Sequence, residues 1–361
     1  MPIRSVPDDV GEALPDALTS ALRAAAAILR TASSVTVVCH ENPDADTLGG
    51  GLALTRALER IGVTAEIVCA TGWPSTLAFL PHVATVKPTP SMDGGAIVLV
   101  DCASIERAGP ELAAWIRGSD GAVVNVDHHA SNDGYGTATC IDRSAAATSE
   151  VVARLVAELD CPPDRDMATL LLAGILHDTD GLRVPETSAS TLRLTADLME
   201  AGAEIAVITR ELFARRPLAA LHLWGHVASS LETSIGGRVV IGTLTDAMLT
   251  ATGAVLLDAE DLPELIASAQ DAEIALLLRQ LGPDETRVSI RTSGGVDAAV
   301  LAMEFGGGGH ARAAGCTIPA GIGGARELLL AASRRHLAGA GFEPAEGSSP
   351  VTDPSGDGLE W

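Results

Sequence analysis

The sequence predicts an α/β protein in which a doubly wound parallel sheet is followed by a smaller α+β domain. Two observations support this fold class. Between residues 15 and 129, segments with helical apolar spacing alternate with short runs rich in Val and Ile, which is the βαβ rhythm of a parallel sheet. After residue 229, strand-like segments follow one another across a Gly-Gly turn, a pattern typical of hairpins.

In the first domain, helices and strands are expected to alternate along the chain. Right-handed crossovers between the parallel strands would place helices on both faces of the sheet. From Ala145 to Gly202 the apolar spacing is helical throughout. Before that stretch, the expected elements are a helix over 15–32, a strand over 35–40, a helix over 51–62, strands over 65–70 and 96–101, a helix over 111–118 and a strand over 122–129.

The second domain is expected to consist mainly of antiparallel strands. Gly236 and Gly237 separate two strand-like segments as a hairpin, and further strands are expected over 273–282 and 286–293. Pro217 is a helix-start signal within the segment that connects the domains. The predicted divisions are a first domain at 1–207, a connector at 208–230, a second domain at 231–342 and a tail at 343–361, whose Pro, Ser, Gly and Asp content predicts disorder.

The composition favours a cytoplasmic protein with two apolar cores. Of 361 residues, 47% are hydrophobic, and the longest apolar runs are far shorter than the roughly 18 residues that span a bilayer. The first residues are acidic and proline-rich, unlike a signal peptide. The net charge of −23 argues against binding of long duplex nucleic acid. The six scattered cysteines are expected to be buried thiols.

Side chains able to bind metal follow three of the predicted parallel strands. Because the carboxyl ends of parallel strands meet at one edge of a sheet, we expect these residues to converge on one crevice. Asp178, at the end of an apolar helix, is a further candidate. Taken alone, the Asp-His-His stretch would fit a structural histidine pair equally well. The strand-end residues are His40, Asp44, Asp46, Asp101, Asp127, His128 and His129.

The chemistry of these candidates favours hard or borderline cations. Carboxylates with a minority of imidazoles suit Mn²⁺ or Mg²⁺, and no thiolate has the spacing of a zinc ligand. The carboxylates outnumber what one cation requires, and two neighbouring cations can activate a water and stabilise a departing oxygen. The sequence therefore favours two-metal phosphoester hydrolysis.

A glycine-rich segment in the second domain, residues 305–315, is a candidate anion site. Its glycines would allow close backbone approach, and a helix is expected to begin near His310. An ordinary flexible loop is the alternative. Arg291 could lie beside the segment, and the embedded His310 and Arg312 favour phosphate binding.

Taken together, the ordered motifs resemble the DHH phosphoesterase family with a GGGH-type associated domain. The resemblance runs from Val35 to Ile318, and the branch that looks most similar contains oligoribonucleases (nanoRNases), 3′-phosphoadenosine 5′-phosphate (pAp) phosphatases and actinobacterial cyclic-di-AMP phosphodiesterases. The motifs that carry it are HENPDAD at 40–46, VD at 100–101, DHHASN at 127–132, HDTDG at 177–181 and GGGGHARAAG at 306–315.

The resemblance implies a ligand set for two Mn²⁺ ions per chain, with Mg²⁺ or Co²⁺ as substitutes. Asp101 would bridge the ions, His129 would act as general acid or polar stabiliser, and Asp127 would orient its neighbours. The first ion would be held by His40, Asp44 and Asp101, and the second by Asp46, Asp101, His128 and Asp178. The implied substrate-binding residues are Arg291, Gly307, Gly308, Gly309, His310 and Arg312.

The implied function is Mn²⁺-dependent hydrolysis of short oligoribonucleotides, including pApA, and conversion of pAp to AMP. Cyclic-di-AMP is a further candidate substrate, and a homodimer is expected. The alternatives are a single-strand DNA exonuclease or polyphosphatase of the same family, and a nucleotide sensor that does not hydrolyse. Asp180 precedes the glycine of the fourth motif, so the choice between Asp178 and Asp180 stays open, with Asp178 preferred.

Overall fold

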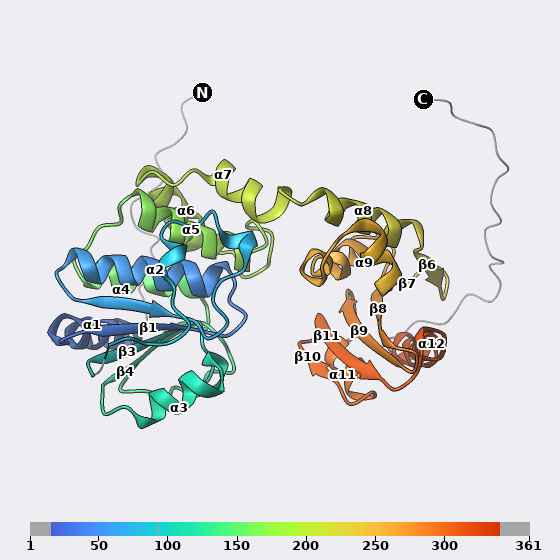
Figure 1. Ribbon diagram of the computed structural model, residues 1–361, viewed down its shortest axis with the longest axis horizontal. Helices are drawn as coiled ribbons and strands as arrows, with labels where there is room; N and C mark the ends of the chain where they lie inside the picture. Colours follow the sequence, from blue (N-terminus) through green and yellow to red (C-terminus); the bar gives the residue numbers. More distant parts are fainter. Residues whose placement is uncertain (1–15, 93, 340–361) are drawn as a thin grey trace. The chain divides into compact units, whose positions relative to one another are not determined.

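The computed structural model describes residues 16–92 and 94–339, which form two compact units (Figure 1). The units divide between Arg215 and Arg216, inside the connector expected at 208–230. A helix begins directly after Pro217, as its position predicts. The predicted tail at 343–361 lies outside the described residues. Each unit is described below by itself.

The first unit is built on a five-stranded sheet in which every strand runs parallel to its neighbours, which confirms the predicted doubly wound sheet. The strand order is β2-β1-β3-β4-β5, so the direction of winding reverses between β1 and β3. Such sheets bind ligands where the order reverses, at the carboxyl ends of the strands. The strands are β1 (Val35–Cys39), β2 (Ala65–Val68), β3 (Ala96–Val100), β4 (Val123–Asp127) and β5 (Ala138–Ile141).

Helices cover both faces of this sheet, because successive strand residues point to opposite sides and both sets are apolar. Val37 belongs to the core shared with helices α2, α4 and α5, whereas Val38 belongs to the core shared with α3. In Figure 1, α2 and α3 lie on opposite sides of the sheet. The helices are α1 (Asp16–Thr31), α2 (Ala45–Arg60), α3 (Pro110–Gly118), α4 (Thr148–Glu158), α5 (Arg165–Asp178), α6 (Ala189–Glu200) and α7 (Ile205–Thr209), with short turns η1 (Ser75–Leu77), η2 (Val83–Thr85), η3 (Ile105–Ala108) and η4 (Arg210–Ala214).

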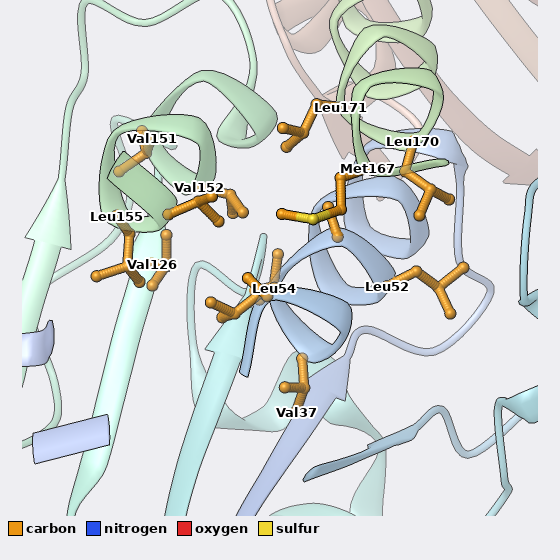
Figure 2. Packing of buried hydrophobic residues seen from close by; sticks show 14 of the residues in the cluster. Val37, Leu52, Leu54, Val126, Val151, Val152, Leu155, Met167, Leu170 and Leu171 are labelled. Carbon is orange, nitrogen blue, oxygen red and sulfur yellow. The ribbon is translucent and has the colours of Figure 1, made fainter. Parts of the chain in front are cut away.

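A buried apolar core holds the start of α2 in place. Figure 2 shows Leu54 of α2, Val152 of α4 and Met167 of α5 among the side chains that fill it, and all three are fully buried. Burying each such side chain contributes about 1.5–3 kcal/mol. Helices α2 and α5 approach so closely that a Cβ at Gly49 would overlap the carbonyl oxygen of Leu170. The first turn of α2 is therefore firmly anchored.

The second unit contains a six-stranded mixed sheet in the order β10-β11-β9-β8-β7-β6. Only β7 and β8 pair in parallel, and the antiparallel β6–β7 pair confirms the hairpin predicted at Gly236 and Gly237. The strands are β6 (Glu232–Ser234), β7 (Val239–Leu244), β8 (Ile274–Gly282), β9 (Glu285–Thr292), β10 (Gly308–Gly309) and β11 (Ala313–Ile318). The helices are α8 (Leu218–Ser229), α9 (Asp246–Thr252), η5 (Leu256–Ala259), α10 (Leu262–Ala267), α11 (Ala298–Met303) and α12 (Ile322–Gly339).

The prediction of a helix that begins near His310 is wrong. The chain instead forms a tight hairpin in which His310 and Ala313 exchange two backbone hydrogen bonds, at 2.8 and 3.2 Å. A Cβ at Gly309 would lie 2.5 Å from the carbonyl oxygen of Ala313, and one at Gly307 would overlap Gly315. These two glycines therefore serve the close approach of β10 to β11, whereas Gly306 and Gly308 face open space.

Two expectations from composition can be compared with the structure. All six cysteines are buried free thiols, as expected. Within the part of the chain that the structure describes, no helix combines the length and the apolar character needed to cross a lipid bilayer.

Candidate metal centre

The six predicted metal ligands come together at the carboxyl edge of the parallel sheet. His40 follows β1, Asp101 follows β3, His128 follows β4, and Asp178 ends α5. Their ligand atoms form overlapping groups in which all atoms lie within 4.8 Å of one another. The four groups are His40, Asp44 and Asp101; Asp46, His128 and Asp178; Asp101, His128 and His129; and Asp44, His177 and Asp178.

Asp101 occupies the middle of this arrangement. Its Oδ2 lies 3.4 Å from Nε2 of His40, and its Oδ1 lies 3.8 Å from Nε2 of His128. Its backbone has φ +62°, an uncommon conformation for a residue with a side chain, and such strain occurs most often at functional sites. A carboxylate with one oxygen toward each group is suited to bridge two cations.

Two of the histidines present one nitrogen to these carboxylates. Nδ1 of His40 lies 2.9 Å from the carbonyl oxygen of Glu41, and Nδ1 of His128 lies 3.1 Å from that of Ala145. A carbonyl oxygen can only accept a hydrogen bond, so each Nδ1 is the donor and each Nε2 is left for another partner. Nε2 of His40 is buried without a hydrogen-bond partner. A buried unpaired nitrogen facing carboxylates fits a metal ligand.

Helix N-termini hold the first two aspartates. Asp44 caps α2, and its Oδ1 accepts hydrogen bonds from the backbone N–H of Asp46 and of Thr47, at 2.9 and 3.0 Å. The carboxylate of Asp46 accepts from the first two N–H groups of α4, those of Thr148 at 2.7 Å and Ser149 at 2.9 Å. These bonds orient both carboxylates before any cation is bound.

A glycine of α5 makes room for Asp46. A Cβ at Gly174 would lie 2.6 Å from Oδ1 of Asp46 and would overlap the hydroxyl of Ser149. Any side chain at this position would therefore push the carboxylate out of its place.

The crowded carboxylates and imidazoles change each other's affinity for protons. Burial lowers the pKa of His40, but the carboxylates of Asp101 and Asp44, which face its Nε2 at 3.4 and 3.5 Å, raise it to about 10. Burial likewise lowers the pKa of His128, but the hydrogen bond to Asp178 and the charge of Asp46 together raise it to about 10. Protons thus balance clustered negative charge here, a role that divalent cations can take over.

The buried aspartates show the complementary effect. Burial and the charge of Asp178 raise the pKa of Asp46, and burial followed by the charge of Asp101 raises the pKa of Asp178, although its hydrogen bond with His128 opposes this. Adjacent carboxylates cannot all ionise in a buried site without a cation.

His129 belongs to a hydrogen-bonded chain behind the ligands. Its Nδ1 lies 2.7 Å from Oδ1 of Asp127, and this hydrogen bond raises the pKa of His129. Asn132 donates to Oδ2 of Asp127 at 2.6 Å. Burial raises the pKa of Asp127, but the hydrogen bonds from His129 and Asn132 lower it overall. The contact with Asp127 therefore fixes the His129 ring and leaves Nε2 as the available nitrogen.

Two residues of the site were not singled out from the sequence. His177 shares a group with Asp44 and Asp178, and its Nε2 lies 3.9 Å from Oδ2 of Asp44. Its position next to Asp178 was the available signal. The hydroxyl of Thr148 donates a hydrogen bond to Asp101, and no sequence pattern marks this residue. Asp180 belongs to none of the groups and forms an exposed ion pair with Arg183.

A cavity of about 390 Å³ opens beside the His40 group. Its walls combine hydrogen-bond donors and acceptors, so it can accept polar parts of a substrate next to the ligands. The lining residues are His40, Glu41, Asn42, Ser104, Glu106 and Arg107.

The predicted substrate-binding residues gather at the β10–β11 hairpin of the second unit. Arg291 pairs with Ala313 in the β9–β11 register, so it lies beside the hairpin. Its Nε donates to Oε1 of Glu264 at 2.7 Å. Arg312 donates to the carbonyl oxygen of Gly294 at 2.7 Å, and His310 is exposed.

Comparison with known proteins identifies the family. Residues 34–175 match the DHH family, N-terminal domain, and residues 250–338 match the DHHA1 domain. The bifunctional oligoribonuclease and PAP phosphatase NrnA of Thermus thermophilus is 32% identical over 324 residues, which cover 89% of this chain and 96% of that protein. The chain belongs to the DHH family of phosphoesterases. It is therefore a phosphoester hydrolase, as the motifs predicted.

A second NrnA relative and two solved structures are also similar to this chain. The bifunctional oligoribonuclease and PAP phosphatase NrnA of Bacillus subtilis is 26% identical over 81% of this chain and 92% of its own length. An exopolyphosphatase-related protein from Bacteroides fragilis has a similar fold, with a TM-score of 0.82, 20% identity and coverage of 90% of this chain and 98% of that one. RecJ of Thermus thermophilus in complex with Mn²⁺ has a TM-score of 0.52 and 17% identity over 93% of this chain and 57% of RecJ.

Proposed function

We propose that this chain hydrolyses short oligoribonucleotides and dephosphorylates pAp to AMP, with Mn²⁺ as its cofactor. The observation that carries the proposal is the position of Asp101, whose two oxygens face two different ligand groups. The names of the NrnA relatives, which describe oligoribonuclease and PAP phosphatase activities, support the substrate class.

The residues present fit two cations. The unpaired Nε2 of His40 with Asp44 and Asp101 supports one site, and the group of Asp46, His128 and Asp178, together with Asp101, supports the other. RecJ, a structural relative, is described in complex with Mn²⁺. When bound, such ions would polarise the scissile phosphate and lower the pKa of a water nucleophile.

His129 is the proposed proton donor. Asp127 holds Nδ1 and raises the pKa of His129, so the ring keeps its proton to a higher pH than it would without this partner. A proton on Nε2 could then pass to the oxygen that leaves the phosphorus. Thr148 keeps Asp101 in place during this step through its hydroxyl.

Arg291 and the β10–β11 hairpin are proposed to bind the substrate. Gly308, which faces open space, His310 and Arg312 would supply backbone and side-chain donors. The charge of −23 disfavours long polyanions, so short substrates are expected. The family resemblance further suggests cyclic-di-AMP as a substrate, a homodimer and a cytoplasmic location.

The test is a comparison of substrates under one condition. The purified chain with Mn²⁺ is incubated with pAp, pApA, a short RNA, cyclic-di-AMP, a 20-mer of single-stranded DNA and polyphosphate, and products are separated by chromatography. We expect AMP from pAp and mononucleotides from pApA, with loss of both activities in EDTA. Faster cleavage of the DNA or of polyphosphate would favour the alternative family functions, and tight binding without any product would favour a sensor.

A further inference from the structure

Two arginines of the second unit lie opposite each other without an acidic partner. In the β8–β9 register Arg279 pairs with Arg287, and in the β9–β11 register Arg287 pairs with Thr317. Nη1 of Arg287 lies 3.4 Å from the hydroxyl of Thr317. Alternation along the strands places these three side chains on one face of the sheet. We call Arg279, Arg287 and Thr317 the arginine row.

The arginine row lies on the face of the sheet that also carries Arg291. The neighbouring residues of the strands, such as Leu278, Val288 and Cys316, point to the buried core on the other face. Arg287 is exposed, and Arg279 is half-buried. Beside them stands Gly315, where a Cβ would lie 3.0 Å from Nη2 of Arg287, so the glycine leaves space for that guanidinium.

No carboxylate of the described residues balances the positive charge of the arginine row. Like charges directly opposite each other on neighbouring strands destabilise a sheet. Nε of Arg279 is buried and has no hydrogen-bond partner, and no ion pair to either arginine occurs within residues 16–92 and 94–339. Arg238, directly before β7, and Arg291 of β9 do have glutamate partners. In a protein of net charge −23, two neighbouring arginines without a carboxylate call for an external anion.

We propose that the arginine row is an anion subsite for a phosphodiester of the oligoribonucleotide, distinct from the phosphate site proposed at Arg291. The proposal rests on the function proposed above and extends it. Arg287 and Arg291 are four residues apart on β9, which corresponds to about 13 Å along an extended strand. The guanidinium of Arg287 lies at Thr317 and that of Arg291 at Glu264, so the two groups are held at separate positions. The row is therefore assigned to a further phosphate, in substrates that are longer than pAp.

Binding of two nucleotides to the full-length chain tests the subsite without hydrolysis. In EDTA at low salt, fluorescence polarisation gives the Kd of labelled pApApA, and competition gives the Kd of pAp. Arg287→Gln should raise the Kd of pApApA about tenfold or more, the loss expected for a charged hydrogen bond. The Kd of pApApA should rise by a factor at least about fivefold larger than the factor for pAp. For pApApA, the slope of log Kd against log salt concentration should become smaller by about 0.7.

Arg334→Gln is the matched control, because Arg334 is an exposed arginine of α12 in the same unit. It should change neither Kd by more than about twofold. Arg279→Gln and Thr317→Val each remove another donor of the row, so they decide the question if Arg287→Gln fails to fold by circular dichroism. Equal effects on pAp and pApApA, or an equal effect of Arg334→Gln, would overturn the proposal.

The experiment also separates this inference from the proposed function. If the wild-type chain binds pApApA through the row but hydrolyses no nucleotide with Mn²⁺, the subsite stands and the proposed function falls. If it hydrolyses pAp and pApA while the row variants bind both nucleotides as the wild type does, the proposed function stands and the subsite falls.

Discussion

The hydroxyl of Thr148 donates a 2.7 Å hydrogen bond to Oδ1 of Asp101, so the first residue of α4 fixes the carboxylate at the centre of the site. Asp101→Ala should abolish hydrolysis and lower the bound Mn²⁺ below two per chain, because a bridging carboxylate serves both ions. Thr148→Val removes only the hydrogen bond and should keep both ions while the rate falls about tenfold. Metal analysis and steady-state rates test this. Two Mn²⁺ ions retained in Asp101→Ala would contradict the bridging role.

His129→Ala should separate proton transfer from metal binding. If His129 donates a proton without binding metal, the variant keeps its Mn²⁺ content while kcat falls about 10²-fold or more. Asp127→Asn should cause a smaller fall and move the alkaline limb of the rate profile to lower pH, because Asp127 raises the pKa of His129 and the proton donor is lost above that pKa. A lower Mn²⁺ stoichiometry in His129→Ala would make this residue a ligand instead.

Metal binding should release protons. The pKa of both His40 and His128 is raised to about 10 in the metal-free chain, so each is protonated at pH 8, and a cation requires the neutral ring. Mn²⁺ affinity should therefore rise as the pH increases from 7 to 9. Isothermal titration calorimetry in two buffers of different ionisation enthalpy counts the protons released. An affinity that is constant over this range would show that the rings are already neutral.

Glu264 should compete with the substrate for Arg291. Their 2.7 Å ion pair is partly exposed, so a phosphate can displace the carboxylate. Arg291→Ala should raise KM for pAp by about 10- to 100-fold, as expected for loss of a charged hydrogen bond of about 1.5–3 kcal/mol. Glu264→Gln should lower KM instead. An increase in KM in both variants would mean that the pair itself shapes the site.

Glu66 should stabilise the first unit in a pH-dependent manner. It is 6% exposed, and although burial opposes ionisation, hydrogen bonds from Ser91, Lys87 and the backbone of Met92 lower its pKa from 4.5 to about 2. The folded pKa lies below the unfolded one, so the stabilisation is present above pH 4.5 and is lost as the pH falls toward 2.

Glu66→Gln should therefore cost about 3 kcal/mol at pH 7, since each pH unit between the two pKa values corresponds to about 1.4 kcal/mol. The difference from the wild type should shrink below pH 4.5. Urea unfolding at several pH values measures it, with the exposed Glu59→Gln as control. A cost that does not change with pH would indicate a purely steric effect.

The convergence of the candidate ligands could be predicted from the sequence because local patterns mark the strands, and parallel strands end at one edge of the sheet. Each of His40, Asp101 and His128 follows its own apolar strand, and the topology brings the strand ends together. Thr148 could not be found in this way, since its partner Asp101 is 47 residues distant and nothing local marks the contact. The short β5 was missed because a strand of four residues gives only a weak pattern in the sequence.

The expected helix at His310 failed for a related reason. Glycines permit close backbone approach to a ligand or to another strand, and the sequence does not say which. In the structure Gly307 and Gly309 approach β11, a contact that depends on the pairing of distant strands.

The two amide protons that α4 donates to Asp46 connect this helix to the cation site. Thr148 and Ser149 can exchange these protons with solvent only when the first turn of α4 opens and releases the carboxylate. A cation held by Asp46 must therefore slow that opening. By the same coupling, any change that loosens the turn must weaken cation binding by an equal free energy. Deuterium uptake at these two amides would thus report cation occupancy from within the backbone.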